Sequence, residues 1–295
     1  MQTLCADLDP ARPLPTPWPD YERWLVKEWR SLLASGPSEL TVQEFLESHP
    51  VLLPGGDGDA GPGGHHGPHL DGVFREVPLK GLNRDQRPDF MWITRSTSLL
   101  TPICIEIEKP DRAWFTSKGD PTAELTHARS QINKWRDWFS QPPNQMIFRE
   151  QYVGNEYSNK QLLPIYILIY GRAREFDPSA RIHLDADDLR RQRDQGNKSD
   201  ELSMTFDSLK PRYALKDFVT LSMNKHGVEL HAVPPSFTTG PCTMHVAKVA
   251  RDPSPIKKTL LWTPERKQYV QDRWRHWQQI ADNGWNGPVA LDGGE

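Results

Sequence analysis

The sequence predicts an α/β fold in which a mixed β-sheet is flanked by helices, and three observations support this prediction. Three segments with strand character follow one another at 71–81, 88–94 and 101–108. A helical pattern then covers residues 120–140, and a nearly continuous apolar run follows at 162–172. Because such a run is typical of a strand buried on both faces, this order predicts a mixed sheet with a crossover helix.

The other elements are predicted from periodicity and capping residues. Apolar side chains at helical spacing predict a helix at 21–35, and Thr41-x-x-Glu44 has the form of a capping box that starts a second helix. Asp120 is the expected cap of the crossover helix, with Pro121 in its first turn. Further predictions are a polar helix at 184–195, a strand at 202–210, a hairpin at 217–233 around Asn224-Lys225-His226-Gly227, and a last helix from Thr263 and Pro264.

Composition divides the chain into three regions. Residues 1–40 are expected to form a proline-rich arm and a helix, and residues 41–220 an α/β domain that carries the motifs. Residues 221–295 are expected to form a C-terminal hairpin and helical extension, and the helix after residue 263 is expected to lie outside the motif-bearing core.

Composition also narrows the class of protein. With 36% hydrophobic and 25% charged residues the chain is globular, and its net charge of −3 means that nucleic acid could bind only a local basic patch. Cys5, Cys104 and Cys242 form no C-x-x-C pair, which argues against a disulfide framework or zinc ribbon and suits a reducing cytoplasm. No signal-peptide pattern opens the chain, and the longest apolar run is about half a membrane helix. We therefore expect a cytoplasmic protein with no membrane partner.

Two glutamates on one apolar strand are the chief functional signal. Strand side chains alternate, so Glu106 and Glu108 share the face of Cys104 and should repel each other. Asp89 opens the preceding strand, and a hairpin connection would bring it beside them. A solvated sheet face, and a strand merely starting at Asp89, are the plain alternatives. The first would place more polar residues upstream on that face, where the sequence has Pro102 and Cys104. We therefore expect Asp89, Glu106 and Glu108 to bind Mg²⁺, which removes the repulsion.

Several motifs together resemble a known nuclease family. Pro88-Asp89 followed by Glu106-Ile107-Glu108 is similar to the PD-(D/E)XK signature, and Gln131 begins a helix motif similar to Q-x-x-x-Y. More narrowly, the chain resembles the C-terminal nuclease domain of Shedu (SduA) antiphage proteins over roughly residues 40–220. The segments that carry this resemblance, with the Gln131 helix, are FLESHPVLL (45–53), RPDF (87–90), IEIEKP (105–110), PIYILIYGR (164–172) and MTFDSL (204–209).

The resemblance implies a restriction-endonuclease-like domain that cuts DNA with Mg²⁺, with Mn²⁺ as a possible substitute. Glu108 stands where the signature has lysine, an arrangement found in some active restriction enzymes of the superfamily. Glu108 would then bind metal or position water, and Gln131 would hold water or phosphate. Lys109, which should face away from Glu106, is a candidate for stabilising transition-state charge. The family also implies defence against phage and a homo-oligomer.

DNA contacts are expected from basic residues near the motifs, because phosphate contacts come mainly from arginine and lysine. Solvated loop charges are the plain alternative for each of them. Trp114 and Phe115 could stack on a base. The predicted phosphate contacts are Lys80, Arg84, Arg87, Arg112, Lys118 and Arg129.

Two other functions remain open from the sequence. A nuclease-fold protein could bind nucleic acid or a protein partner without cutting, with Glu108 as the damaged position. A structural or interaction module could carry the same glutamates paired with a neighbouring arginine. Experiment distinguishes these functions from the nuclease. DNA cleavage indicates a nuclease, DNA binding without cleavage indicates the binding protein, and absence of both metal and DNA binding indicates the structural module.

Overall fold

A computed structural model gives the fold of the chain. It describes residues 11–62, 66–81, 84–154, 157, 159–179 and 185–284. The first half of the predicted N-terminal arm, residues 1–10, and the predicted first residue of the polar helix, 184, lie outside the described residues.

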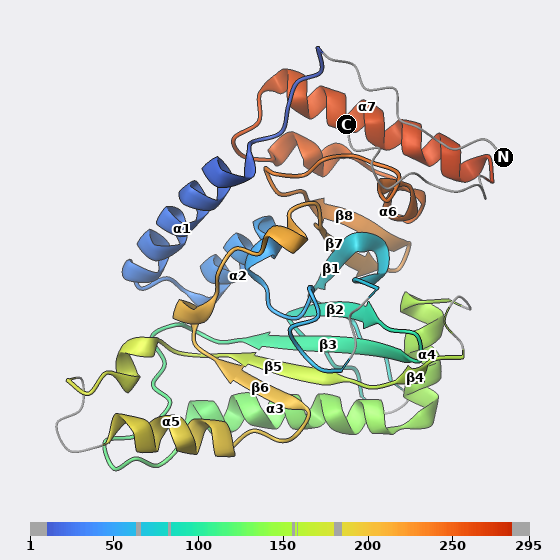
Figure 1. Ribbon diagram of the computed structural model, residues 1–295. Coiled ribbons are helices and arrows are strands. Elements are labelled where there is room, and N and C mark those ends of the chain that lie inside the picture. The colour runs from blue at the N-terminus through green and yellow to red at the C-terminus, as the bar shows by residue number, and fades with distance from the viewer. Residues whose placement is uncertain are drawn as a thin grey trace.

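The centre of the molecule is an eight-stranded mixed sheet with the order β6-β5-β3-β2-β1-β7-β8, and β4 pairs with β3 (Figure 1). The β1–β2 and β2–β3 pairs are antiparallel, whereas β3 pairs in parallel with β5, as a crossover connection requires. The α/β class and the mixed sheet predicted from the sequence are confirmed. The strands are β1 (Gly72–Arg75), β2 (Phe90–Arg95), β3 (Leu99–Ile107), β4 (Gln161–Leu162), β5 (Ile165–Ile169), β6 (Glu201–Met204), β7 (Val219–Asn224) and β8 (Gly227–Ala232).

Helices cover both faces of this sheet (Figure 1). On one face, Ile103 and Ile105 of β3 belong to the same buried cluster as residues of α1 and α2. On the other face, Cys104 belongs to the cluster formed with α3 and α4 and with α6 and α7. The alternation along β3 therefore directs Glu106 toward the α3 side. The helices are α1 (Trp18–Ala34), α2 (Glu39–Ser48), α3 (Ala123–Ser140), α4 (Pro142–Tyr152), α5 (Ala186–Gln195), α6 (Thr243–Val249) and α7 (Pro264–Asp282).

Two predicted helix caps are wrong by a few residues. Ser38, not Thr41, caps α2, because the Ser38 hydroxyl accepts a hydrogen bond from the Thr41 backbone N–H. Thr122, not Asp120, caps α3 and accepts from the backbone N–H of Leu125. In both cases a second side chain with capping ability stood near the helix start, and the sequence alone could not rank the two.

The C-terminal region continues the same sheet. The predicted hairpin forms with its turn between Asn224 and Gly227, and β7 pairs in parallel with β1. The predicted boundary at 220/221 thus falls within β7, and the division into three regions stays a prediction. α6 and α7 pack together over this end of the sheet (Figure 1). No helix within the described ranges has the length and apolarity to cross a membrane.

Candidate functional site

Asp89 and Glu106 meet at one end of the sheet. The antiparallel register pairs Phe90 with Ile105, so Asp89, one residue before β2, lies opposite Glu106 near the end of β3. One Asp89 carboxylate oxygen accepts a hydrogen bond of 2.8 Å from the Ile107 backbone N–H. The two acidic side chains also hydrogen-bond to each other, which requires a proton between them. The pair predicted from the sequence is therefore assembled by strand register.

The surroundings of this pair disfavour its negative charge. Burial, with the nearby charges of Glu39 and Glu108, raises the pKa of Asp89 to about 7 despite the hydrogen bond from Ile107. Burial and the charge of Asp89 raise the pKa of Glu106 well above its ordinary value. Two half-buried acids that hold a proton near neutral pH are typical of a site where a cation or proton transfer is needed.

Glu108 differs from the other two acids because it has a cationic partner. Burial raises its pKa, and Arg112 opposes that rise through an ion pair of 3.2 Å. The neighbouring Lys109 pairs with Asp111 at 2.8 Å, and 41% of its side chain is exposed. That Lys109 faces away from Glu106 stays a prediction. The metal-binding role of Glu108 and the catalytic role of Lys109 stay predictions.

Glu39 is the residue that sequence reasoning missed. It lies in the first turn of α2, and its charge acts on Asp89, Glu106 and Glu108. No motif marks it, because it comes from the other face of the sheet and about 50 residues earlier in the chain. The only signal available was its position after Ser38, the residue that proved to be the cap.

A basic groove of about 690 Å³ lies along α3. Gln131 lines it, and its amide oxygen accepts a hydrogen bond of 2.6 Å from Lys134. Three of the residues predicted to contact phosphate line the same groove: Lys80, Arg84 and Arg87. Arg87 is 66% exposed at its side chain and lies two residues from Asp89, so the groove begins next to the acidic pair.

The other predicted DNA-binding residues are placed differently. Arg129 lies 3.9 Å from Glu201 and donates to the Arg193 carbonyl, so its guanidinium is engaged inside the protein. Lys118 is exposed in the loop before α3, and Arg112 pairs with Glu108. Their DNA contacts stay predictions. Base stacking by Trp114 or Phe115 is wrong, because the former is fully buried and the latter only 3% exposed.

The acidic pair fits a hard divalent cation. Mg²⁺ in proteins is held by one or two carboxylates, with water and substrate phosphate completing its coordination. Asp89 and Glu106 can supply two such ligands, and among the described residues no cationic side chain contributes to their pKa shifts. No group of three or more His, Cys, Asp or Glu side chains in the described part of the chain is arranged to hold a metal by itself. The proposed Mg²⁺ site therefore depends on the two carboxylates of Asp89 and Glu106, with water and phosphate as the remaining ligands.

Gly171, which follows β5, supports the backbone of this site and gives a first prediction. Its φ of +57° is left-handed, and a Cβ there would lie 2.8 Å from the Arg112 carbonyl oxygen. We expect Gly171→Ala to lower the free energy of unfolding by about 2–4 kcal/mol in urea denaturation, because left-handed strain and overpacking act together. Gly154→Ala is the matched control, since its φ is +63° with nothing within 4 Å, and should cost about 1 kcal/mol. Equal losses would show that the contact with Arg112 is unimportant.

Comparison with known proteins identifies a family for most of the chain. A comparison with curated proteins finds no match. The family model described as Shedu protein SduA, C-terminal, matches residues 36–209, which is more than half of the chain. The matched segment contains Glu39, Asp89, Glu106 and the groove-lining side of α3. The chain belongs to the family of the Shedu protein SduA C-terminal region.

Proposed function

We propose that this protein is a Mg²⁺-dependent DNA endonuclease of a Shedu-like antiphage defence system. Membership of the Shedu family supports the role in antiviral defence. The observation that carries the nuclease proposal is the Asp89–Glu106 pair, whose pKa values are raised and for which the described residues supply no cationic partner. Held by these two carboxylates, a divalent cation would offset their mutual repulsion and supply charge that favours a phosphodiester at the same place.

Each residue of the site has a separate task in this proposal. Asp89 and Glu106 would hold the cation, and the Ile107 N–H fixes the orientation of the Asp89 carboxylate. Bound Mg²⁺ supplies charge that polarises the phosphodiester and acidifies water. Glu108 positions the attacking water and accepts its proton, a task that a pKa raised toward neutrality favours. Arg112 holds the Glu108 carboxylate in place at 3.2 Å.

The basic groove is the proposed path of the DNA backbone. Lys80, Arg84 and Arg87 line one side, and Lys134 with Gln131 lines the α3 side. Four cationic side chains and one acid, Asp85, line this open groove, and Arg87 also lies 3.7 Å from Glu76. The groove therefore carries a local positive charge, although the net charge of the chain is −3. Gln131 can donate its amide N–H groups to phosphate oxygen or water, since its amide oxygen is occupied by Lys134.

A second candidate is a DNA-binding protein of the same fold that does not cut. The Glu108–Arg112 ion pair favours it, because a carboxylate held by arginine is a weaker base and a weaker metal ligand. The basic groove would serve either function. Homo-oligomer formation, implied by the family resemblance, is compatible with both.

Plasmid cleavage distinguishes the two candidates. Supercoiled plasmid incubated with the full chain and Mg²⁺ should become nicked or linear, and excess EDTA should stop the reaction because the acids then lack their cation. Gel mobility shift on the same DNA should fall steeply with salt, as phosphate contacts require. A salt-sensitive shift without cleavage in Mg²⁺ or Mn²⁺ would reject the nuclease proposal in favour of the binding protein. If the protein neither shifts nor cleaves the DNA, both the nuclease and the DNA-binding candidate are rejected.

A further inference from the structure

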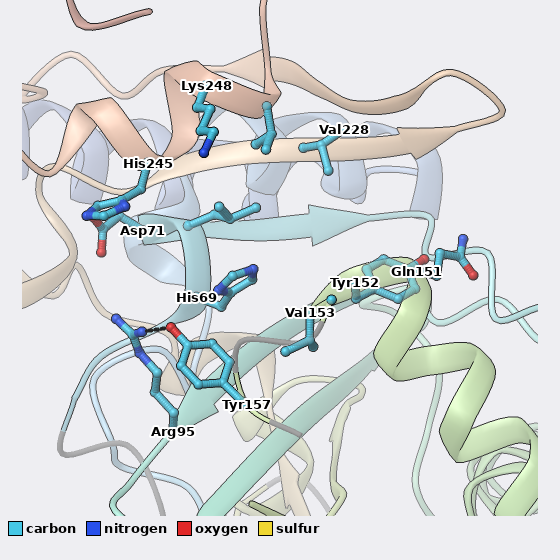
Figure 2. Close-up of a pocket in the computed structure, with 13 residues that line it drawn as sticks. His69, Asp71, Arg95, Gln151, Tyr152, Val153, Tyr157, Val228, His245 and Lys248 are labelled. Atoms are coloured by element: carbon cyan, nitrogen blue, oxygen red, sulfur yellow. Dashed lines mark hydrogen bonds between the residues drawn. The ribbon is translucent and has the colours of Figure 1, made fainter. Parts of the chain in front are cut away.

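A second cavity lies at the end of the strands opposite the acidic pair. It has a volume of about 490 Å³ and is lined by residues from β2, α4, β8 and α6 and from the segment before β1. Arg95 ends β2, whereas Asp89 precedes its first residue, so a strand of six residues, about 20 Å, separates the two sites. Figure 2 shows the side chains of His69, Arg95 and Lys248 surrounding this cavity.

The cavity has cationic groups on opposite walls. The Arg95 guanidinium donates to the Tyr157 hydroxyl and lies over that ring at 5.2 Å, which fixes it against the wall (Figure 2). Its Nε atom is buried and has no hydrogen-bond partner among the described residues. Lys248 and His245 of α6 face it from the other wall and are exposed. An anion between these walls would meet donors on two sides.

Strained backbone places an acceptor in the same cavity. Leu70 and Asp71 have φ values of 60° and 47°, so two consecutive non-glycine residues are left-handed. Such strain persists only where the surroundings enforce it, and it is common at ligand sites. The Asp71 carboxylate makes no side-chain hydrogen bond or ion pair within the described part of the chain, although it is largely enclosed. Burial raises the pKa of Asp71 to about 6, while His245 and Arg95 oppose the rise.

The rest of the cavity is apolar and has one amide. Leu70, Val153, Val228 and Val249 supply the apolar lining, and Gln151 stands at the edge. A volume near 490 Å³ is within the range of small-molecule sites and far exceeds the space that inorganic phosphate needs. The lining offers three kinds of contact. Arg95 and Lys248 can bind an anionic group, the Asp71 carboxylate can accept from hydroxyl groups, and the apolar wall can pack against a flat ring. One class of ligand carries all three of these groups.

We propose that this cavity binds a mononucleotide, with its phosphates between Arg95 and the Lys248–His245 wall. Asp71 accepts hydrogen bonds from the ribose hydroxyls, a pairing that carboxylates make in dinucleotide-binding folds. The base lies against the valine side chains, and Gln151 contacts its edge. The inference goes beyond the proposed nuclease activity and does not depend on it, since the two sites share no residue.

Isothermal titration calorimetry on the full chain in EDTA tests the proposal, because chelation removes metal-dependent phosphate binding at the acidic pair. ATP, GTP and AMP are titrated alongside inorganic phosphate and a 5′-phosphorylated oligonucleotide. At least one nucleotide should bind more tightly than inorganic phosphate. Lys248→Glu should weaken it about tenfold or more, since a charge-assisted contact is lost, whereas Lys27→Glu on α1 makes the same charge change away from the cavity and should not.

Asp71→Asn provides the second readout, because asparagine tolerates the left-handed backbone that Asp71 adopts. It should reduce the preference for a ribonucleotide over its deoxy counterpart, measured by titrating ATP beside dATP. The proposal is overturned if no nucleotide binds, if phosphate binds equally well, if only the oligonucleotide binds, or if Lys248→Glu binds like the parent protein. Glu106→Gln should bind nucleotide normally, so a failure at the acidic pair remains distinguishable.

Discussion

Glu106→Gln should abolish Mg²⁺-dependent plasmid cleavage while leaving the protein folded. Glutamine has nearly the same shape but carries no charge, so the pair loses half of its negative charge for a cation. Loss of roughly 4 kcal/mol of transition-state stabilisation corresponds to about a thousandfold lower rate. Initial rates of plasmid nicking, measured at saturating Mg²⁺ beside the thermal unfolding midpoint, check this result.

The matched control is Glu44→Gln. Glu44 is an exposed acid on α2, the helix that also carries Glu39, so the substitution makes the same chemical change outside the site. It should leave cleavage unchanged. Cleavage by Glu106→Gln at the parental rate would mean that the reaction does not pass through the Asp89–Glu106 pair, and the nuclease proposal would then lose its main support.

Local patterns predicted the sheet and the acidic pair for a definite physical reason. Strand alternation put Glu106 on the face of Cys104, and a hairpin connection must return Asp89 to that face, so sequence spacing determined which groups meet. The hairpin at Asn224–Gly227 was predictable in the same way, from turn residues between two short alternating runs. These features depend on neighbours along the chain or one strand away.

Features that depend on distant packing were not predictable. The charge of Glu39 acts on the acids from α2, a helix that packs on the opposite face of the sheet. Trp114 looked like a base-stacking residue in a loop, yet the Glu175 carboxylate accepts from its backbone N–H and the ring is buried against Tyr170. The nucleotide cavity combines Arg95 with Lys248, residues more than 150 positions apart that no local pattern connects.

The acidic pair should also make the metal-free protein less stable as pH rises. The pKa of Asp89 is about 7 in the folded protein, above its ordinary value of 3.8, so the folded state binds the proton more tightly than the unfolded chain. The resulting stabilisation is complete below about pH 4 and is lost as pH rises from about 4 to 7. Glu106, whose pKa is raised further, extends the loss to higher pH.

Asp89→Asn should remove most of this dependence and stabilise the metal-free protein at pH 8. Asparagine keeps an oxygen to accept from the Ile107 N–H, and its amide can donate to Glu106 in place of the shared proton. Each tenfold difference in proton affinity corresponds to about 1.4 kcal/mol, so we expect a gain on the order of 2–4 kcal/mol. Urea denaturation from pH 5 to 8.5 in EDTA measures it. Asp111→Asn, an exposed acid nearby, should leave the slope unchanged.

The effect of Mg²⁺ on stability distinguishes a metal site from two acids that are buried without binding a metal. In the parent protein Mg²⁺ should restore stability above pH 7, because it binds the deprotonated pair of the folded state and not the unfolded chain. Below pH 6 protons compete, and the same concentration should have little effect. Asp89→Asn should lose this stabilisation although it is the more stable protein in EDTA. A parental unfolding free energy that stays constant from pH 5 to 8.5, or an equal response of both proteins to Mg²⁺, would contradict this account of the pair.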